Sequence, residues 1–175
     1  SFVDRKITSV LELGGGFGNI AYHFTLKGAK AVVEDIDNAY LAVAQKRHPN
    51  ISVLKHDINN TFPFPDNSFD LVTCTGTLHY SYIKDINKIV EEMFRVSRGF
   101  LLLDLLSRYA PYRFLEKIYN PAYNPKTYSP KEAELLLKKF NLKIVNRIGS
   151  KTPYFLSEIM PFSGKTVYIL TEKQF

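Results

Sequence analysis

The sequence predicts an α/β fold, with a seven-stranded, mostly parallel sheet and helices on both of its faces. Short apolar runs typical of strands alternate with amphipathic runs typical of helices along the chain. The first apolar run breaks directly into a glycine-rich turn at residues 14–18. Residues 99–106 are apolar nearly throughout, as expected of a central strand covered on both faces. Together these observations favour strands that are joined by helical crossovers in one sheet.

Seven apolar runs are expected to form the strands. In chain order they are Ser9–Leu13, Lys30–Glu34, Ser52–Lys55, Asp70–Cys74, Gly99–Leu106, Lys143–Ile148 and Thr166–Thr171. The first helix, Asn19–Leu26, follows the glycine turn and ends at Gly28, a residue suited to a helix C-terminus. Asp37 or Asn38 is expected to cap the second helix, which runs to Arg47.

Two further helices are predicted from capping residues and apolar spacing. Asp85 is expected to cap the third, in which four apolar residues recur at i, i+3, i+4, i+7 spacing. Ser129, Pro130 and Glu132 provide a cap, a first-turn proline and the reciprocal acid of a capping box. The fourth helix therefore has the clearest start signal in the chain.

Composition places the chain among ordinary globular proteins. Its 175 residues are 45% hydrophobic and 23% charged, which suits one domain with a proper core. No apolar run approaches the length of a bilayer, and the N-terminal residues do not resemble a secretory signal. One cysteine, Cys74, excludes an intramolecular disulfide and favours a reducing, cytoplasmic location. The net charge of +6 is spread along the chain, so a solvated surface explains it more simply than nucleic-acid binding.

Residues 107–128 interrupt the regular alternation, and we expect them to form a substrate-side insertion within a single domain of residues 1–175. Five of the 11 tyrosines lie in this segment, interleaved with three prolines. A connection of this length is usually functional or disordered, and the aromatic content argues against disorder. The segment leaves the predicted fifth strand at the edge where open α/β sheets bind ligands.

A strand, a glycine turn, a helix, a second strand and an acid follow one another near the N-terminus. The first strand leads into Gly14, Gly16 and Gly18, and the second is followed by Asp35. This order is suited to holding a nucleoside at the carboxyl ends of parallel strands. Dinucleotide dehydrogenases place glycine or alanine where this chain has Asn19, so that class fits the spacing worst.

Residues 12–18, which read ELGGGFG, resemble motif I of the class I S-adenosylmethionine-dependent methyltransferases. Residues 62–72 read FPFPDNSFDLV, similar to the approach to the fourth strand in the small-molecule, UbiE/type-11-like branch of that family. Residues 78–80 read LHY and resemble that branch's LHH. The resemblance covers residues 9–106 with high specificity. It implies a Rossmann-like sheet with an antiparallel last strand, S-adenosylmethionine as cofactor, and methyl transfer.

The resemblance also implies which residues bind the cofactor. They are Glu12, Gly14, Gly16, Gly18, Asp35, Ile36, Asp57, Ile58, Cys74 and Thr75. Glycine lets the backbone approach the cofactor closely, Asp35 can accept both ribose hydroxyls, and Asp57 can accept the adenine amino group. Backbone groups of Cys74 and Thr75 would line the methionine side. Asp35 and Asp57 could instead act as caps or turn formers, and Glu12 could be a structural carboxylate.

Methyl transfer requires that two reactants be held at attack distance, because the sulfonium already activates the methyl group. His79, after the fourth strand, is the candidate general base, and a hydrogen-bonded structural histidine explains it as well. Tyr80, Tyr82 and Tyr109 are expected to line the pocket of a small-molecule acceptor, or to pack as core or lid. No Cys/His cluster has metal-ligand spacing, so no metal site is predicted.

Other functions stay open at this stage. The pI of about 9.3 also suits an RNA or protein methyltransferase, which would need a basic patch beside the pocket. A module that binds the cofactor without turnover is the non-enzyme alternative. Family members usually carry one or more helices before the first strand, and this chain starts close to that strand without methionine. We therefore expect an N-terminal segment to precede residue 1.

Overall fold

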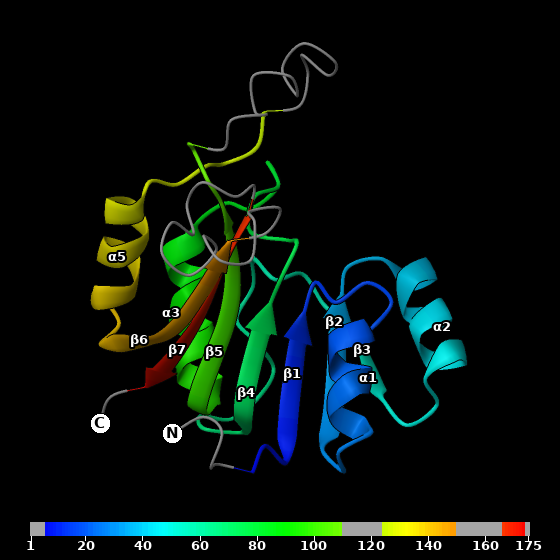
Figure 1. The fold of residues 1–175 in the computed structure, drawn as a ribbon. Helices are drawn as coiled ribbons and strands as arrows, with labels where there is room; N and C mark the ends of the chain where they lie inside the picture. Colours follow the sequence, from blue (N-terminus) through cyan, green and yellow to red (C-terminus); the bar gives the residue numbers. More distant parts are fainter. Residues whose placement is uncertain (1–5, 110–123, 150–165, 174–175) are drawn as a thin grey trace.

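A computed structural model describes residues 6–109, 124–149 and 166–173 (Figure 1). Within them, seven strands form one sheet in the order β3-β2-β1-β4-β5-β7-β6. The strands are β1 Ser9–Leu13, β2 Lys30–Asp35, β3 Ser52–Lys55, β4 Phe69–Cys74, β5 Ser97–Leu106, β6 Leu142–Gly149 and β7 Thr166–Lys173. The first five strands pair in parallel, whereas β7 runs antiparallel to both β5 and β6. The predicted sheet and its antiparallel last strand are confirmed.

Four helices in this part of the chain cover both faces of the sheet (Figure 1). They are α1 Asn19–Thr25, α2 Asn38–Arg47, α3 Ile86–Val96 and α5 Pro130–Lys138. Val10 of β1 belongs to the core shared with α1 and α2, whereas Leu11 and Leu13 belong to the core shared with α3 and α5. Neighbouring residues of a strand point to opposite faces, which explains this division. No helix in the described ranges is long and apolar enough to cross a bilayer.

The helices begin at the predicted capping residues. Asp37 accepts a hydrogen bond from the backbone N–H of Ala39 at 2.7 Å, and Asp85 caps α3 in the same way. Ser129 and Glu132 form the reciprocal capping box at the start of α5. Local side-chain chemistry therefore fixes where three of the helices start.

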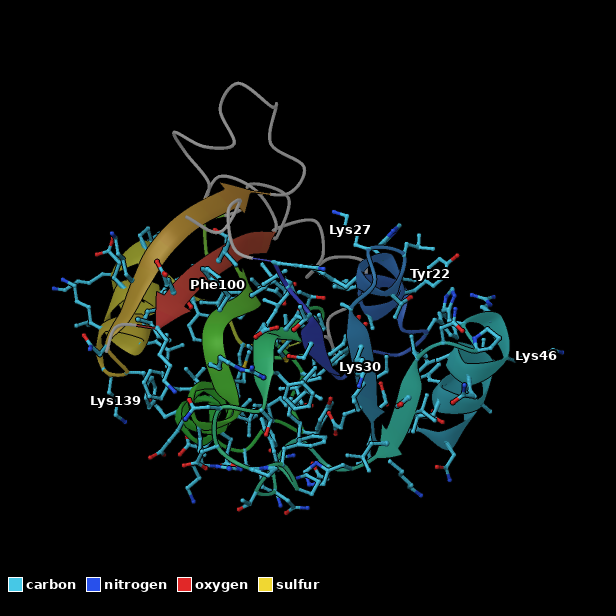
Figure 2. The ribbon with its side chains drawn as sticks, turned by 90° about the horizontal axis from the view of Figure 1, so that it is seen from below. Tyr22, Lys27, Lys30, Lys46, Phe100 and Lys139 are labelled. Atoms are coloured by element: carbon cyan, nitrogen blue, oxygen red, sulfur yellow. The ribbon has the colours of Figure 1, made fainter. Side chains whose placement is uncertain are left out.

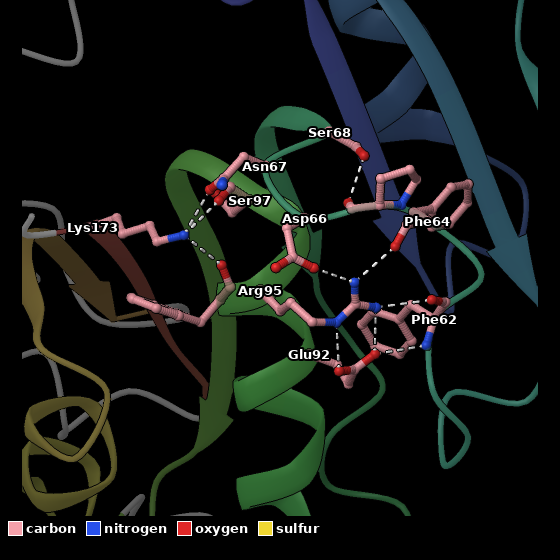
Figure 3. A network of polar contacts seen from close by, with 11 residues as sticks. Phe62, Phe64, Asp66, Asn67, Ser68, Glu92, Arg95, Ser97 and Lys173 are labelled. Carbon is pink, nitrogen blue, oxygen red and sulfur yellow. Dashed lines mark hydrogen bonds and ion pairs between the residues drawn. The ribbon is translucent and has the colours of Figure 1, made fainter.

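Arg95 of α3 fastens the segment that leads into β4 (Figure 3). Its guanidinium donates to the backbone oxygens of Phe62 at 2.9 Å and of Phe64 at 2.8 Å. It also pairs with Glu92 at 2.7 Å and with Asp66 at 2.9 Å. Glu92 in turn accepts a hydrogen bond from the backbone N–H of Phe62. Residues of α3 thus bind the first half of the 62–72 segment, the part of the sequence that resembles the approach to the fourth strand in the family.

Lys173, at the end of β7, lies beside the polar contacts of Arg95 (Figure 3). Its Nζ donates to the side chain of Asn67 at 2.9 Å and to the backbone oxygens of Phe94 and Ser97 at 3.1 and 3.0 Å. Burial lowers the pKa of Lys173. These contacts join the last strand to α3 and to the start of β5.

The two ends of the 107–128 segment meet at the carboxyl end of β5. Ser107 and Tyr128 form a parallel bridge, and the N–H of Tyr128 donates to the oxygen of Leu106 at 2.8 Å. Residues 110–123 lie outside the described residues. The substrate-side insertion and the single-domain organisation therefore stay predictions.

Candidate functional site

The glycine loop closes the carboxyl end of β1. Gly14, Gly16 and Gly18 have φ values of 57°, 53° and 71°, a left-handed conformation that other residues rarely adopt. A Cβ atom on Gly14 would lie 2.3 Å from Oγ1 of Thr77, whereas one on Gly16 would meet nothing within 4 Å. The loop therefore packs closely against the segment after β4 and leaves open space beside Gly16, where a ligand could approach the backbone.

Two of the predicted cofactor acids, Glu12 and Asp35, hold this loop in place. Glu12 is buried, and its Oε2 accepts a hydrogen bond from the N–H of Ala21 at 2.7 Å, in the first turns of α1. Asp35 accepts from the N–H of Gly16 and from the N–H of Asp37, both at 2.9 Å. Burial raises the pKa of Glu12 to about 7, against the opposing effect of its backbone hydrogen bonds. The structural alternative for Glu12 is thus present in the structure, and the contact of either acid with a cofactor stays a prediction.

Glu34 is a third acid at the loop, and the sequence reasoning did not assign it a role. It is 1% exposed, and its Oε2 accepts a hydrogen bond from the N–H of Gly14 at 3.2 Å. Burial raises the pKa of Glu34 to about 8, and the charges of Asp35 and Asp57 add to the shift. The sequence does carry a signal for Glu34, because it stands next to Asp35 at the end of a buried strand. A charged side chain at such a position needs a partner.

Asp57 lies after β3 and forms a turn with Asn59. Its Oδ1 accepts hydrogen bonds from the backbone N–H and the side-chain amide of Asn59, both at 2.9 Å, and these bonds lower the pKa of Asp57. The structure thus shows Asp57 as a turn former, which was the alternative to a contact with adenine. The contact with adenine stays a prediction. Ile58 is buried in the core, while Ile36 is 52% exposed at the same edge of the sheet. Of these two isoleucines, Ile36 therefore offers the open apolar side chain.

Asn59 links this turn to the predicted acceptor side, a contact that sequence reasoning missed. Its amide nitrogen donates to the backbone oxygen of Tyr82 at 3.3 Å, and its amide oxygen accepts from the N–H of Lys84 at 2.9 Å. The two partners are 23 and 25 residues away along the chain, so no local pattern reveals them. One side chain thus fixes the turn at Asp57 relative to the segment after β4.

The end of β4 and the turn after it hold two of the residues predicted to bind the cofactor, Cys74 and Thr75. The Cys74 thiol is completely buried, and burial raises its pKa well above the usual value. Thr75 lies half-buried in the turn that follows. A completely buried thiol is unsuited to act as a thiolate nucleophile. The contribution of these two residues through their backbone groups stays a prediction.

Two residues that were not predicted connect this turn to the rest of the site. Oγ1 of Thr77 donates to the oxygen of Gly14 at 3.2 Å. Asp104 of β5 is buried and accepts a hydrogen bond from the N–H of Gly76 at 2.8 Å. Burial raises the pKa of Asp104 to about 6. The turn after β4 is therefore tied both to the glycine loop and to the central strand.

The predicted acceptor residues form a short aromatic strip. The ring of His79 lies 4.5 Å from that of Tyr80, which stacks 5.8 Å from Tyr82. Tyr80 and Tyr82 are 46% and 44% exposed. Burial raises the pKa of Tyr82 to about 12, and the charges of Asp35 and Glu34 contribute. The strip is therefore open to an aromatic or apolar ligand, while the Tyr82 phenol is protonated and electrostatically coupled to the cofactor-side acids.

The far end of the 107–128 segment reaches the same strip. The N–H of Lys126 donates to the oxygen of His79 at 3.0 Å, and its Nζ donates to the oxygen of Ile83. Tyr109 is 61% exposed, and no ring contact joins it to Tyr80 in the described part of the molecule. The structure thus brings together the flank of the segment and the predicted strip, but not Tyr109.

A cavity of about 390 Å³ lies between α3 and α5, apart from these residues. It is lined by Ile86, Asn87, Thr127, Tyr128, Glu132, Leu135, Leu136 and Lys139. None of them is a predicted cofactor residue, while Thr127 and Tyr128 belong to the predicted substrate-side insertion at residues 107–128.

Known proteins resemble this chain in sequence and in fold. A family model described as a methyltransferase domain matches residues 10–99. An uncharacterized methyltransferase of Bacillus subtilis is 33% identical over 58% of this chain and 41% of its own length. A ubiquinone/menaquinone biosynthesis C-methyltransferase of Cronobacter sakazakii is 31% identical over 77% of this chain and 55% of its own length. The chain thus spans about half the length of these relatives.

The fold agrees with solved structures of much lower sequence identity. Magnesium protoporphyrin IX methyltransferase from Synechocystis, solved with bound SAH, superposes with a TM-score of 0.74 at 13% identity. The match covers 94% of this chain and 73% of that one. The fold, the family model and the sequence relatives agree with one another. The chain belongs to the class I S-adenosylmethionine-dependent methyltransferases, in their UbiE-like branch.

Proposed function

We propose that the chain transfers a methyl group from S-adenosylmethionine to a small-molecule acceptor. The observation that carries the proposal is the glycine loop, whose backbone is held by Asp35 at the carboxyl edge of the parallel strands. Ligands of open α/β sheets bind at this edge. Buried acids around the loop also suit a cofactor of net positive charge, because a cation relieves their mutual repulsion.

The residues of this chain would act mainly by positioning. Asp35 would turn from Gly16 toward the ribose hydroxyls, and the free oxygen of Asp57 would face the adenine amino group. Gly14 and Gly16 would present backbone groups to the methionine portion. When bound, the cofactor supplies a methyl group already activated by its sulfonium, so orientation can account for several kcal/mol of the barrier.

A small acceptor is supported by the aromatic strip and by the sequence relatives. Tyr80 and Tyr82 offer open ring faces at the edge where the methyl group would leave the cofactor. The named relative from Cronobacter acts in ubiquinone/menaquinone biosynthesis, and the structural neighbour from Synechocystis on magnesium protoporphyrin IX. His79 is the proposed general base, since the phenol of Tyr82, with a pKa of about 12, keeps its proton at neutral pH.

An RNA acceptor is the weaker alternative, because the basic residues are dispersed. Figure 2 shows Lys27, Lys46 and Lys139 on separate elements, projecting away from one another. Binding to RNA would require a basic patch beside the glycine loop. Salt-sensitive retention on RNA, together with methylation of that RNA, would favour the alternative.

Calorimetric titration with S-adenosylmethionine and with its demethylated product tests the proposal. Binding should be saturable, and Asp35→Ala should weaken it by about tenfold or more, because a charged hydrogen-bond acceptor is lost. Asp37→Ala is the matched control. That acid lies two residues away and caps α2 through Ala39, so its loss should lower stability but leave affinity unchanged. An unchanged affinity in Asp35→Ala would remove Asp35 from the site.

A further inference from the structure

Glu34 and His56 face each other beside the glycine loop. Nδ1 of His56 lies 3.5 Å from Oε1 of Glu34, while Oε2 of Glu34 accepts the N–H of Gly14 at 3.2 Å. The two side chains are 2% and 16% exposed, Glu34 being the more buried. Nδ1 of His56 has no hydrogen-bond partner among the residues with described positions. A single proton placed between the two groups would satisfy both of them.

The surroundings of Glu34 are acidic or neutral. Asp35 on the same strand and Asp57 after β3 raise its pKa by their charge. Glu34 in turn raises the pKa of Cys74, on β4, and of Tyr82, in the segment after it. Glu12 of β1 also raises the pKa of Cys74, which places a further acid nearby. The cations that act on these acids are His56 and Lys84, whose charges lower the pKa of Asp57. The acids outnumber them, so the site holds more negative than positive charge once Glu34 ionises.

We propose that Glu34 and His56 are a proton-sharing pair that positions Gly14 and adjusts how strongly the site attracts a cationic cofactor. The inference rests on the proposed cofactor. A proton on Glu34 leaves a neutral acid that accepts the Gly14 N–H weakly. Loss of that proton leaves a carboxylate, which holds the N–H more firmly and attracts the sulfonium. The pair acts through Gly14, so both are positioning residues.

Glu34→Gln tests the pair, because glutamine keeps the size and the acceptor oxygen but cannot ionise. The quantity to measure is the ratio of the variant's Kd to the native Kd, from about pH 6 to about pH 9. Ionisation of the ligand itself cancels in this ratio. For S-adenosylmethionine the ratio should be near one at the acidic end and rise by about tenfold at the basic end, as for a coupling of one pKa unit. For the demethylated product, which lacks the sulfonium charge, the rise should be clearly smaller, because only the effect on Gly14 remains.

The exposed Glu91→Gln on α3 is the matched control, and its ratio should be flat for both ligands. A flat ratio in Glu34→Gln, or an equal rise for both ligands, would overturn the inference. If the native chain binds neither ligand at any pH, the proposed function fails instead.

A measurement on the native chain needs no variant. The amide signal of Gly14 should shift with pH in nuclear magnetic resonance spectra as Glu34 gains or loses its proton. This pH dependence should disappear in Glu34→Gln, which a purely structural role for Glu34 does not predict. A Gly14 amide signal that does not respond to the ionisation of Glu34 would also overturn the inference.

Discussion

Gly14 and Gly16 share a backbone conformation but differ in their surroundings. Both have φ above 50°, which costs a side chain about 1–2 kcal/mol. Gly14 also lies against Thr77, whose Oγ1 donates to its carbonyl oxygen. Gly16 is therefore required for its backbone conformation alone. Gly14 is required both for its conformation and because a side chain would collide with Thr77.

We predict that Gly16→Ala lowers the free energy of unfolding by about 1–2 kcal/mol, from backbone strain alone. Gly14→Ala should cost about 1–3 kcal/mol more, because its Cβ would lie 2.3 Å from Oγ1 of Thr77. Urea denaturation of the two variants measures the difference. Adding Thr77→Ala to Gly14→Ala should recover much of the extra loss. Equal losses for the two single variants would contradict the steric argument.

At the scale of elements, α3 does more than cover the sheet. Through Arg95 it fixes the approach to β4, and the side chain of Arg95 is 27% exposed. Arg98, at the start of β5, is 52% exposed and makes fewer contacts, to Ser68 and Asp70. The two arginines are three residues apart, and Arg95 makes more hydrogen bonds and ion pairs than Arg98 does.

Arg95→Met should therefore lower the free energy of unfolding by about 2–3 kcal/mol, since several charge-assisted hydrogen bonds are lost and Glu92 is left without its partner. Arg98→Met, the matched control, should cost less than about 1 kcal/mol, as is typical of an exposed ion pair. Chemical denaturation at neutral pH compares them. If Arg98→Met lowers the free energy of unfolding as much as Arg95→Met does, the contribution of these contacts to stability does not depend on how buried the arginine is.

Element boundaries could be read from the sequence because their causes are local. The acids that cap α2 and α3, and the capping box Ser129–Glu132, lie within a few residues of the groups they bind. The contacts of Glu34 with Gly14, Asn59 with Tyr82 and Asp104 with Gly76 join residues 20 or more positions apart. No local pattern encodes such pairs. The acids predicted at the site were those with family counterparts, and the missed ones depend on packing between strands.

At the scale of the whole molecule, three buried acids with raised pKa values in the described part of the chain govern the expected response to pH near neutrality. Burial raises the pKa of Asp104 to about 6, of Glu12 to about 7 and of Glu34 to about 8, from usual values of 3.8 for Asp and 4.5 for Glu. The folded chain therefore binds more protons than the unfolded chain between about pH 4 and pH 8. Acids whose pKa is lowered, such as Asp70 and Glu92, affect stability only below about pH 5.5, because their unfolded values are 3.8 and 4.5.

The cofactor-free chain should consequently lose stability as the pH rises from about 5.5 to about 8.5. Urea midpoints at constant ionic strength measure the trend. Glu34→Gln should make the decline shallower, because one of the three raised acids no longer ionises. A stability that is constant or that increases over this window would contradict the argument.

The position of β7 in the sheet has a consequence for biosynthesis. This strand pairs with β5 along Phe100–Leu106, yet residues 107–165 are translated between the two. While the ribosome is still making that stretch, the most apolar strand of the protein has an unprotected edge, a template for pairing with other chains. The edge stays unpaired until β7 itself has been translated, so the nascent polypeptide should depend on chaperones while residues 107–165 are being made.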